Sequence, residues 1–294
     1  MQQAFNTIAI TGKPNDAGTV KTVHRIAQYL QKRGIEIRLD SAIIAGQEAP
    51  PKCRLAAGSE LIDGADLVIS VGGDGTLLRT GRLVVDQNIP LLGINRGRLG
   101  FLVDLQPNDD DGLNAILAGN FIEEDRTLLT AEVHKNGDIL ATGYALNDVV
   151  LYKWNTARLI EFNTYIDGHL LTMHRADGII ISTPTGSTAY ALAGGGPIIH
   201  PSVDAICLVP VSPHTLSNRP LVINADSTIE VEVPDDQLER VGVSCDGQDD
   251  LGLHLGSRLL VRRHPKQVRL IHPPQYRYFD ILRAKLRWGD INTQ

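Results

Sequence analysis

The sequence predicts an N-terminal doubly wound α/β domain followed by an antiparallel β-sandwich-like domain. Three observations support this prediction. Over residues 7–94, short apolar runs alternate with a segment of helical periodicity, as in parallel α/β domains. Over residues 128–262, many short alternating segments are joined by tight turns. Helical periodicity returns over residues 279–288, which we expect to pack back on the first domain. We place the first domain at residues 1–125 with 275–294, and the second at 126–274.

The first domain is predicted from its apolar strands. A helix after the first strand carries apolar residues at helical spacing and ends at Gly34. Residues 42–58 are weakly patterned, contain two consecutive prolines, and are expected to form a mobile excursion. The predicted strands are residues 7–11, 35–39, 67–71 and 89–94.

The central motif of the first domain is Leu-Val-Ile-Ser-Val-Gly-Gly-Asp-Gly-Thr-Leu-Leu at residues 67–78. A buried strand turns through glycines into a helix, so backbone N–H groups at the helix N-terminus can bind a phosphate. The carboxylate of Asp74 lies beside that phosphate site. Residues 95–102 follow the next strand, and ligands of open α/β sheets bind beyond the carboxyl ends of strands. We therefore expect both loops to face one ligand, with Phe101 either stacking on a base or belonging to the core.

The second domain is predicted from short strands and hairpin turns. Asn136-Gly137 and Asp167-Gly168 have the composition of two-residue hairpin turns. The predicted strands are residues 129–134, 139–151, 159–166, 170–174, 206–210, 228–233, 241–245 and 258–262.

Residues 177–190 repeat the construction of the Asp74 motif within the second domain. An apolar strand leads into a turn rich in glycine and hydroxyl groups, and a short helix follows. Backbone amides and polar side chains at such a turn can bind a ribose or a phosphate. Two sites of this construction on two domains predict a ligand held between the domains.

Composition narrows the classes of partner. The formal net charge of −6 argues against a general nucleic-acid binder. The nine basic residues and one acid of residues 258–287 are a local exception, which we interpret as solvated strand and helix faces rather than a phosphate-steering edge or an oligomer contact. The sequence shows no signal peptide and no apolar run long enough for a bilayer. Three dispersed cysteines suit a reducing compartment, so a cytoplasmic protein without a membrane partner is expected.

The Asp74 loop has the residue types of a phosphoryl-transfer site. A carboxylate can accept the proton of a hydroxyl group that attacks a phosphoryl group, and glycines let the backbone approach closely. The loop itself contains no Lys or Arg, so Mg²⁺, backbone amides or distant basic residues must neutralise the phosphate charge. Asp74 is then either the general base or the residue that organises the metal.

Four segments together resemble bacterial NAD kinases. They are residues 72–76 (GGDGT), 93–102 (GINRGRLGFL), 147–148 (ND) and 177–190 (DGIIISTPTGSTAY). The GGDGT signature also occurs in lipid kinases and, loosely, in phosphofructokinases, whereas residues 183–190 combined with 95–102 are specific. The resemblance covers nearly the whole chain. It implies Mg²⁺-dependent transfer of a phosphoryl group from ATP to the 2′-hydroxyl of the adenosine ribose of NAD, and a homodimer or homotetramer.

The resemblance also implies roles for individual residues. Asp74 matches the general base, Asn147 a polar group near the adenosine, and Asp177 an acid on the nicotinamide side. Asp148 stands where the family more often has Glu, a side chain one methylene longer. No metal ligand is assigned. Motif analysis and resemblance together predict these ligand-binding residues: Gly73, Asp74, Gly75, Phe101, Asn147, Asp148, Arg158, Arg175, Asp177, Thr188, Ala189, Tyr190, Ala191, Leu192, Ala193 and Gln248.

Two other functions remain as alternatives. A diacylglycerol-type lipid kinase would share the GGDGT signature but would need a membrane-facing apolar or basic element, which only the basic stretch at 258–287 could supply. A dinucleotide sensor without turnover would keep the pocket, and the presence of Asp74 speaks against it. The choice between NAD and NADH, the choice between ATP and polyphosphate, and control by NADPH stay open.

Overall fold

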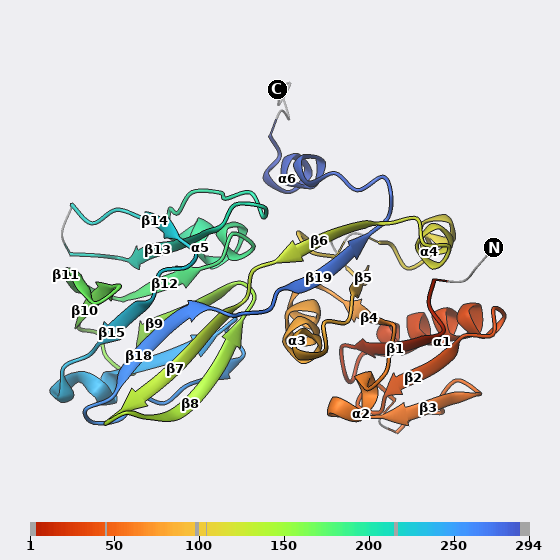
Figure 1. The fold of residues 1–294 in the computed structure, drawn as a ribbon, viewed down its shortest axis with the longest axis horizontal. Helices are drawn as coiled ribbons and strands as arrows, with labels where there is room; N and C mark the ends of the chain where they lie inside the picture. The colour runs from red at the N-terminus through yellow and green to blue at the C-terminus, as the bar shows by residue number, and fades with distance from the viewer. Residues whose placement is uncertain (1–3, 45, 98–99, 104, 215–216, 289–294) are drawn as a thin grey trace. The chain divides into compact units, whose positions relative to one another are not determined.

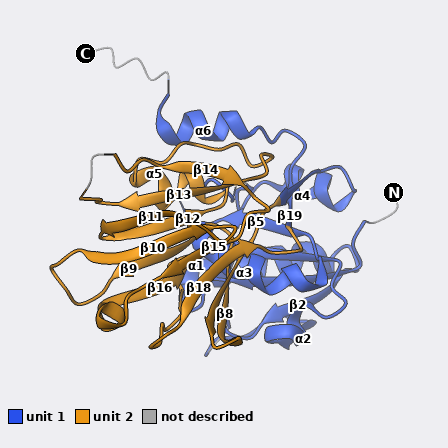
Figure 2. Ribbon diagram, turned by 60° about the vertical axis from the view of Figure 1, so that its left-hand side comes forward, with its two compact units in different colours: residues 1–125, 268–294 blue, residues 126–267 orange. Residues whose placement is uncertain are grey.

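The computed structural model describes residues 4–44, 46–97, 100–103, 105–214 and 217–288. The chain forms two compact units, shown in different colours in Figure 2. Unit 1 comprises Met1–Asp125 with Val268–Gln294, and unit 2 comprises Arg126–Gln267. Among the described residues, no helix has the length and apolar character that crossing a membrane requires.

Unit 1 is built on one seven-stranded sheet with the order β3-β2-β1-β4-β5-β19-β6 (Figure 1). Strand β1 pairs in parallel with both β2 and β4, so the chain moves outward on one side of β1, returns, and continues on the other side. This is the doubly wound topology that the sequence predicts. The strands are β1 Thr7–Gly12, β2 Glu36–Asp40, β3 Cys53–Ala56, β4 Leu67–Gly72, β5 Leu91–Asn95, β6 Ile122–Arg126 and β19 Val268–His272.

The helices of unit 1 follow from capping and apolar spacing. The Asp16 carboxylate accepts a hydrogen bond from the Thr19 amide at 2.6 Å, which caps the start of α1. One face of that helix is buried in the core beside β1 and β4. The helices are α1 Ala17–Gln31, α2 Gly58–Ile62, α3 Asp74–Val84, the 3-10 helix η1 Val85–Gln87, α4 Asp110–Leu117 and α6 Tyr278–Leu286.

Two predictions for unit 1 differ from the structure. The prediction of an excursion at residues 42–58 is wrong, because β3 lies within that segment and pairs in parallel with β2. Strand β3 is an edge strand with two exposed side chains, so it lacks the apolar run that marks a buried strand. The sequence places residues 268–274 in the second domain, whereas β19 pairs in parallel with β5 of unit 1. The C-terminal helix α6 belongs to unit 1, as the sequence predicts.

Unit 2 contains two six-stranded sheets whose assigned pairs are antiparallel (Figure 1). The first has the order β11-β10-β15-β18-β7-β8 and the second β14-β13-β12-β9-β16-β17. The strands are β7 Leu129–Lys135, β8 Asp138–Ala145, β9 Asp148–Lys153, β10 Ile160–Ile166, β11 His169–Ala176, β12 Gly178–Ser182, β13 Ala205–Val211, β14 Leu221–Asn224, β15 Ile229–Glu232, β16 Val241–Cys245, β17 Asp249–Asp250 and β18 Arg258–Arg263. The helices are the 3-10 helices η2 Gly186–Thr188 and η3 Asp235–Arg240, and α5 Tyr190–Ala193.

The core of unit 2 lies between its two sheets. Val149, Leu151 and Ile181 of the second sheet share one apolar cluster with Leu129 and Val261 of the first. Both predicted hairpins form, because the turn residues at 136–137 and 167–168 have the positive φ angles that two-residue turns require.

The prediction of one strand over residues 139–151 is wrong, and the break positions the candidate site. Strand β8 ends at Ala145 in the first sheet, and β9 begins at Asp148 in the second. Leu146 and Asn147 therefore form a corner at which the chain passes from one sheet to the other. The apolar pattern of the sequence continues through this corner, because Leu146 is buried like its neighbours in the strands.

Candidate functional site

In unit 1 the Asp74 loop lies at the carboxyl end of β4, between β1 and β5. Gly73 is the N-cap of α3, and the half-exposed Asp74 and the exposed Gly75 are the first two residues of that helix. The positive end of the helix dipole therefore lies at Asp74. Gly72 lets α3 approach the strand, because a Cβ atom there would lie 2.4 Å from Oγ1 of Thr76.

The loop after β5 lies beside the Asp74 loop, as predicted. Gly72 is the parallel partner of Asn95, and the Arg96 amide donates to the Gly72 carbonyl at 2.9 Å. The Asp74 carboxylate accepts hydrogen bonds from the amides of Phe101 at 2.9 Å and Leu102 at 3.2 Å. Residues 98 and 99 of this loop lie outside the described part of the chain.

Two residues of this loop make close contacts, one with the Asp74 carboxylate and the other with the C-terminal helix. A Cβ atom at Gly100 would lie 2.0 Å from Oδ1 of Asp74, so only glycine lets the loop pass this close to the carboxylate. The half-buried ring of Phe101 has the ammonium group of Lys285, from α6, 5.5 Å from its centroid. Phe101 thus lies in the loop beside the Asp74 carboxylate.

Sequence reasoning missed two arginines at the same edge of the sheet. The guanidinium of Arg79, on α3, donates to the carbonyl of Gly12 at 2.9 Å at the end of β1. Arg96 pairs with Asp16 at 3.5 Å. Both arginines lie near the switch between β1 and β4, where doubly wound sheets bind their ligands. The signal available in the sequence was their spacing from the two loops, five residues after Asp74 and one after Asn95.

In unit 2, four predicted residues line one pocket of about 490 Å³. Its floor is the outer face of the second sheet, where alternate residues of β9 and their partners on β16 face away from the sandwich core. Its wall is the start of α5. The lining residues are Asn147, Asp148, Val150, Tyr152, Ala189, Tyr190, Ser244, Asp246 and Gly247.

The turn after β12 packs tightly against the Leu146–Asn147 corner. The Thr183 hydroxyl donates to the Leu146 carbonyl at 2.6 Å, and the Thr183 amide donates to the Asn147 carbonyl at 2.9 Å. A Cβ atom at Gly186 would lie 2.1 Å from the Asn147 carbonyl oxygen, so this approach requires glycine. The hydroxyl- and glycine-rich motif thus fixes the corner and places Ala189 and Tyr190 at the pocket.

Asp148 is the titratable group of this pocket with an unusual environment. Its side chain is 5% exposed. Burial, and secondarily the negative charge of Asp246, raise the pKa of Asp148 from 3.8 to about 7. Perturbed carboxyl groups of this kind occur at functional sites. The five other lining residues, among them Asp246 and Tyr152, were not predicted.

The remaining predicted residues do not line this pocket. Arg158 is exposed, and Arg175 pairs with Glu161 at 3.7 Å. Asp177 pairs with Lys153 at 2.6 Å. Asp177 lies before the first residue of β12, and the turn that lines the pocket lies after its last residue. Asp177 and that turn are therefore separated by the length of β12, ~17 Å at ~3.3 Å per residue.

Five further predicted residues lie around the hairpin and helix. The exposed Gln248 lies in the turn between β16 and β17, next to Gly247 of the pocket. The Thr188 hydroxyl donates to the carbonyl of Thr185 at 3.1 Å. The side chain of Ala191 is fully buried in a small core against Val150 and Ile180, and its contact with a ligand stays a prediction. Leu192 is half-buried and Ala193 exposed, and neither lines the pocket.

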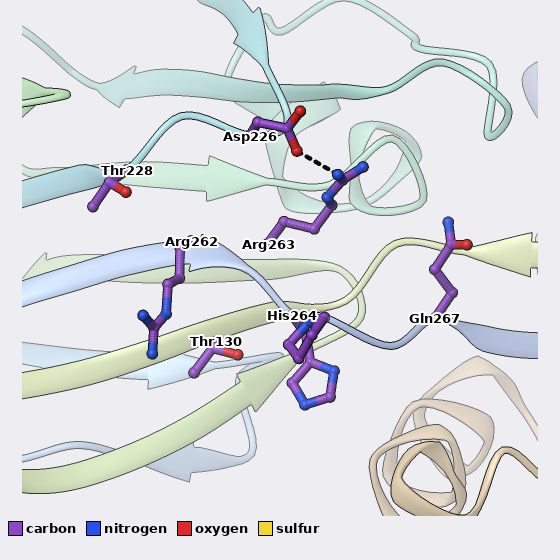
Figure 3. Close-up of a pocket in the computed structure, with 8 residues that line it drawn as sticks. Thr130, Asp226, Thr228, Arg262, Arg263, His264 and Gln267 are labelled. Carbon is purple, nitrogen blue, oxygen red and sulfur yellow. Dashed lines mark hydrogen bonds and ion pairs between the residues drawn. The ribbon is translucent and has the colours of Figure 1, made fainter.

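A second pocket of unit 2, of about 620 Å³, contains none of the predicted residues (Figure 3). Its two arginines are already paired with acids. Arg262 pairs with Glu132 at 2.7 Å, and Arg263 forms an ion pair with Asp226. The interpretation of the basic stretch as solvated faces stays a prediction.

The described residues contain no cluster of three or more His, Cys, Asp or Glu side chains that could hold a metal ion. At the Asp74 loop the protein supplies one carboxylate. Mg²⁺ in phosphoryl-transfer sites is commonly held by one or two carboxylates together with substrate phosphates. Asp74 fits that requirement.

Comparisons with known proteins identify relatives over nearly the whole chain. The family described as the ATP-NAD kinase N-terminal domain matches residues 8–121, and the ATP-NAD kinase C-terminal domain matches residues 146–273. The NAD kinase of Halorhodospira halophila is 51% identical over 97% of this chain and 94% of its own length. The NAD kinase of Shewanella woodyi is 43% identical over 98% of this chain and 99% of its own. The crystal structure of yeast NADH kinase complexed with NADH covers 100% of this chain and 90% of that chain, with a TM-score of 0.87 and 25% identity.

Proposed function

The chain belongs to the ATP-NAD kinase family, and we propose that it transfers a phosphoryl group from ATP to the 2′-hydroxyl of the adenosine ribose of NAD, giving NADP and ADP. The observation that carries the proposal is the position of Asp74, a carboxylate at a helix N-terminus in a chain that both domains of this family match. The lipid-kinase and sensor alternatives receive no support from the comparisons.

In the proposed reaction, Asp74 is the general base. The ribose oxygen forms a bond to the γ-phosphorus of ATP, the bond from that phosphorus to the β–γ bridging oxygen breaks, and ADP leaves. The Asp74 carboxylate accepts the hydroxyl proton as the new bond forms. Its two bonds from the Phe101 and Leu102 amides orient it, and each oxygen retains a lone pair for that proton.

The ligand-binding roles in this proposal divide between the two units. In unit 1, Gly73 and Gly75 let phosphate approach the helix N-terminus. In unit 2, Asn147 and Asp148 provide polar groups for the nucleoside, and Tyr190 provides an aromatic face. Arg158, Arg175, Asp177 and Gln248, together with Thr188, Leu192 and Ala193, remain candidates on the family resemblance alone.

We include Mg²⁺ as the cofactor, bound through the phosphates of ATP; the alternative role of Asp74, as the residue that organises the metal, is an outcome of the test below. When bound, Mg²⁺ would neutralise charge on the transferred phosphoryl group. We also propose a homodimer or homotetramer located in the cytoplasm. Exposed edge strands β11 and β14 supply possible pairing edges, and the three cysteines are free thiols. Light scattering after size-exclusion chromatography tests the assembly.

The activity is tested by incubating the full chain with NAD, ATP and Mg²⁺ and detecting NADP with an NADP-specific dehydrogenase. Asp74→Asn should lower kcat by ~10²-fold or more, because general-base catalysis commonly contributes 10²–10⁴-fold. Asp111→Asn is the matched control, an exposed carboxylate in the first turn of α4 that should leave kcat unchanged. NADH and polyphosphate in place of NAD and ATP define the two specificities.

Three outcomes would change the proposal. Full activity of Asp74→Asn would refute Asp74 as base while keeping the kinase. Rescue of that variant by excess Mg²⁺ would assign Asp74 to the metal instead. A folded wild-type protein that binds NAD but forms no NADP would support a sensor.

A further inference from the structure

We propose that Asp246 is a positioning residue for the acceptor pocket: its carboxylate holds the Leu146–Asn147 corner and thereby fixes Asn147 and Asp148 toward the ligand. The inference rests on the proposed function, because it concerns the pocket to which we assign the nucleoside of NAD. Asp246 also lines that pocket.

The Asp246 carboxylate accepts hydrogen bonds from three consecutive backbone amides. Its Oδ2 accepts from Leu146 at 3.1 Å, and its Oδ1 accepts from Asn147 at 2.8 Å and from Asp148 at 3.3 Å. The backbone amide of Asp246 donates in return to the Asp148 carbonyl at 2.9 Å. Hydrogen bonds from amides to a carboxylate are stronger than those between neutral groups. One side chain therefore holds both corner residues and the first residue of β9.

The corner needs such a partner because its chain leaves one sheet and enters another. The buried backbone N–H and C=O groups of the corner have no neighbouring strand to pair with, yet each needs a hydrogen-bond partner. The Thr183 hydroxyl and amide donate hydrogen bonds to the carbonyls of Leu146 and Asn147, respectively. The Asp246 carboxylate accepts hydrogen bonds from their amides. Asn147 and Asp148 therefore point into the pocket from a segment held on both sides.

Asp246 also influences the charge of Asp148. Its negative charge adds to burial in raising the pKa of Asp148. Among the described residues, three other polar groups face Asp148: Tyr152 lies four residues along the same face of β9, Ser182 is its partner on β12, and Tyr190 lies across the pocket. Replacing Asp246 with a neutral residue should thus lower the pKa of Asp148.

The test variant is Asp246→Asn, which keeps the size of the side chain but replaces an accepting oxygen with an amino group. We expect the KM for NAD to rise by ~10-fold or more, while kcat falls by a smaller factor. We also expect the limb of the kcat/KM profile that reports Asp148 to move to lower pH. A residue that only stabilises a turn would lower the unfolding midpoint without moving either quantity.

Asp167→Asn is a matched control. Asp167 also precedes a glycine in a hairpin, has a φ of 50° against 53° for Asp246, and accepts a backbone amide, that of Thr228, at 2.8 Å. It lies outside the pocket lining. We expect Asp167→Asn to change stability alone, with wild-type KM and pH profile.

Several results would overturn the inference. One is that Asp246→Asn has the same KM for NAD and the same pH profile as wild type. Another is that Asp167→Asn and Asp246→Asn change the KM for NAD by the same factor. If Asp246→Asn does not fold, Asp246→Ser, whose hydroxyl can still accept one amide, takes its place under the same criteria. If the wild type forms no NADP, the proposed function fails, and titration calorimetry with NAD decides the inference. Equal Kd values for wild type and variant, or no binding by wild type, would then reject it.

Discussion

Gly100→Ala tests whether the loop after β5 controls the Asp74 carboxylate. A methyl group at Gly100 would lie 2.0 Å from Oδ1 and 2.7 Å from Cγ of Asp74, so the carboxylate must rotate away. It then loses its hydrogen bonds from the amides of Phe101 and Leu102.

The size of the effect follows from those two bonds. A hydrogen bond to a charged group contributes ~1.5–3 kcal/mol to stability, which sets a ceiling of ~6 kcal/mol for the pair. Because Asp74 is half-exposed, water replaces part of what is lost, and we expect the free energy of unfolding to fall by ~1–2 kcal/mol. The effect on kcat should be larger, ~10²-fold, because a displaced base cannot reach the hydroxyl proton.

The assay combines urea denaturation with the coupled NADP assay. Gly97→Ala is the matched control from the same loop, since a Cβ atom there meets no atom within 4 Å. We expect it to change stability by less than ~0.5 kcal/mol and to leave kcat unchanged. Wild-type kcat and stability in Gly100→Ala would refute the argument that this glycine exists to admit the Asp74 carboxylate.

Three further predictions concern unit 2. Gly186→Ala should lower the free energy of unfolding by ~1–3 kcal/mol and raise the KM for NAD, because its Cβ atom would lie 2.1 Å from the Asn147 carbonyl oxygen. In the control variant Gly252→Ala the nearest contact of the new Cβ atom is at 3.9 Å, so its stability should equal that of wild type. Equal urea midpoints for the two variants would contradict this prediction. His174→Phe should stabilise the protein, because His174 is 3% exposed and neither ring nitrogen has a partner among the described residues. Burial lowers the pKa of His174 from 6.5 to about 4, so the wild type loses stability as pH falls through that interval and the variant should not, which denaturation at pH 4.5 and 7 measures. Asp148→Asn should show a pH dependence of the opposite sign over a similar pH range. The pKa of Asp148 is raised from 3.8 to about 7, so its favourable contribution is complete below 3.8 and is lost as pH rises through about 7, a ceiling of ~4 kcal/mol. The stability of this variant relative to wild type should therefore increase between pH 4 and 8, and a constant difference would refute the assignment.

Most of the fold could be predicted because its signals are local. The six residues of β4 are all buried, so an unbroken apolar run marks the strand. The hairpin turns at 136–137 and 167–168 are marked by residues that accept positive φ. The predictions that failed concern segments without such a signal, among them the edge strand β3 and the sheet change at Leu146 and Asn147.

The candidate site could be predicted only in part, for a related reason. A glycine turn between strand and helix marks Asp74, and hydroxyl-rich residues before a short helix mark Ala189 and Tyr190. The helical pattern alone did not show that Ala191 faces the core, because α5 is too short to display a periodicity.

The sequence by itself determined most strands of both units, the glycine turn at Asp74 and the family to which the chain belongs. Only the tertiary structure decided which groups act together. The Asp74 carboxylate meets amides 27 and 28 residues away, and the Asp246 carboxylate meets amides 98 to 100 residues away. Propensity and periodicity describe each residue with its near neighbours, whereas a buried hydrogen bond between distant segments is selected by the packing of whole sheets. The partners of Asp74 and Asp246 are for that reason properties of the folded chain.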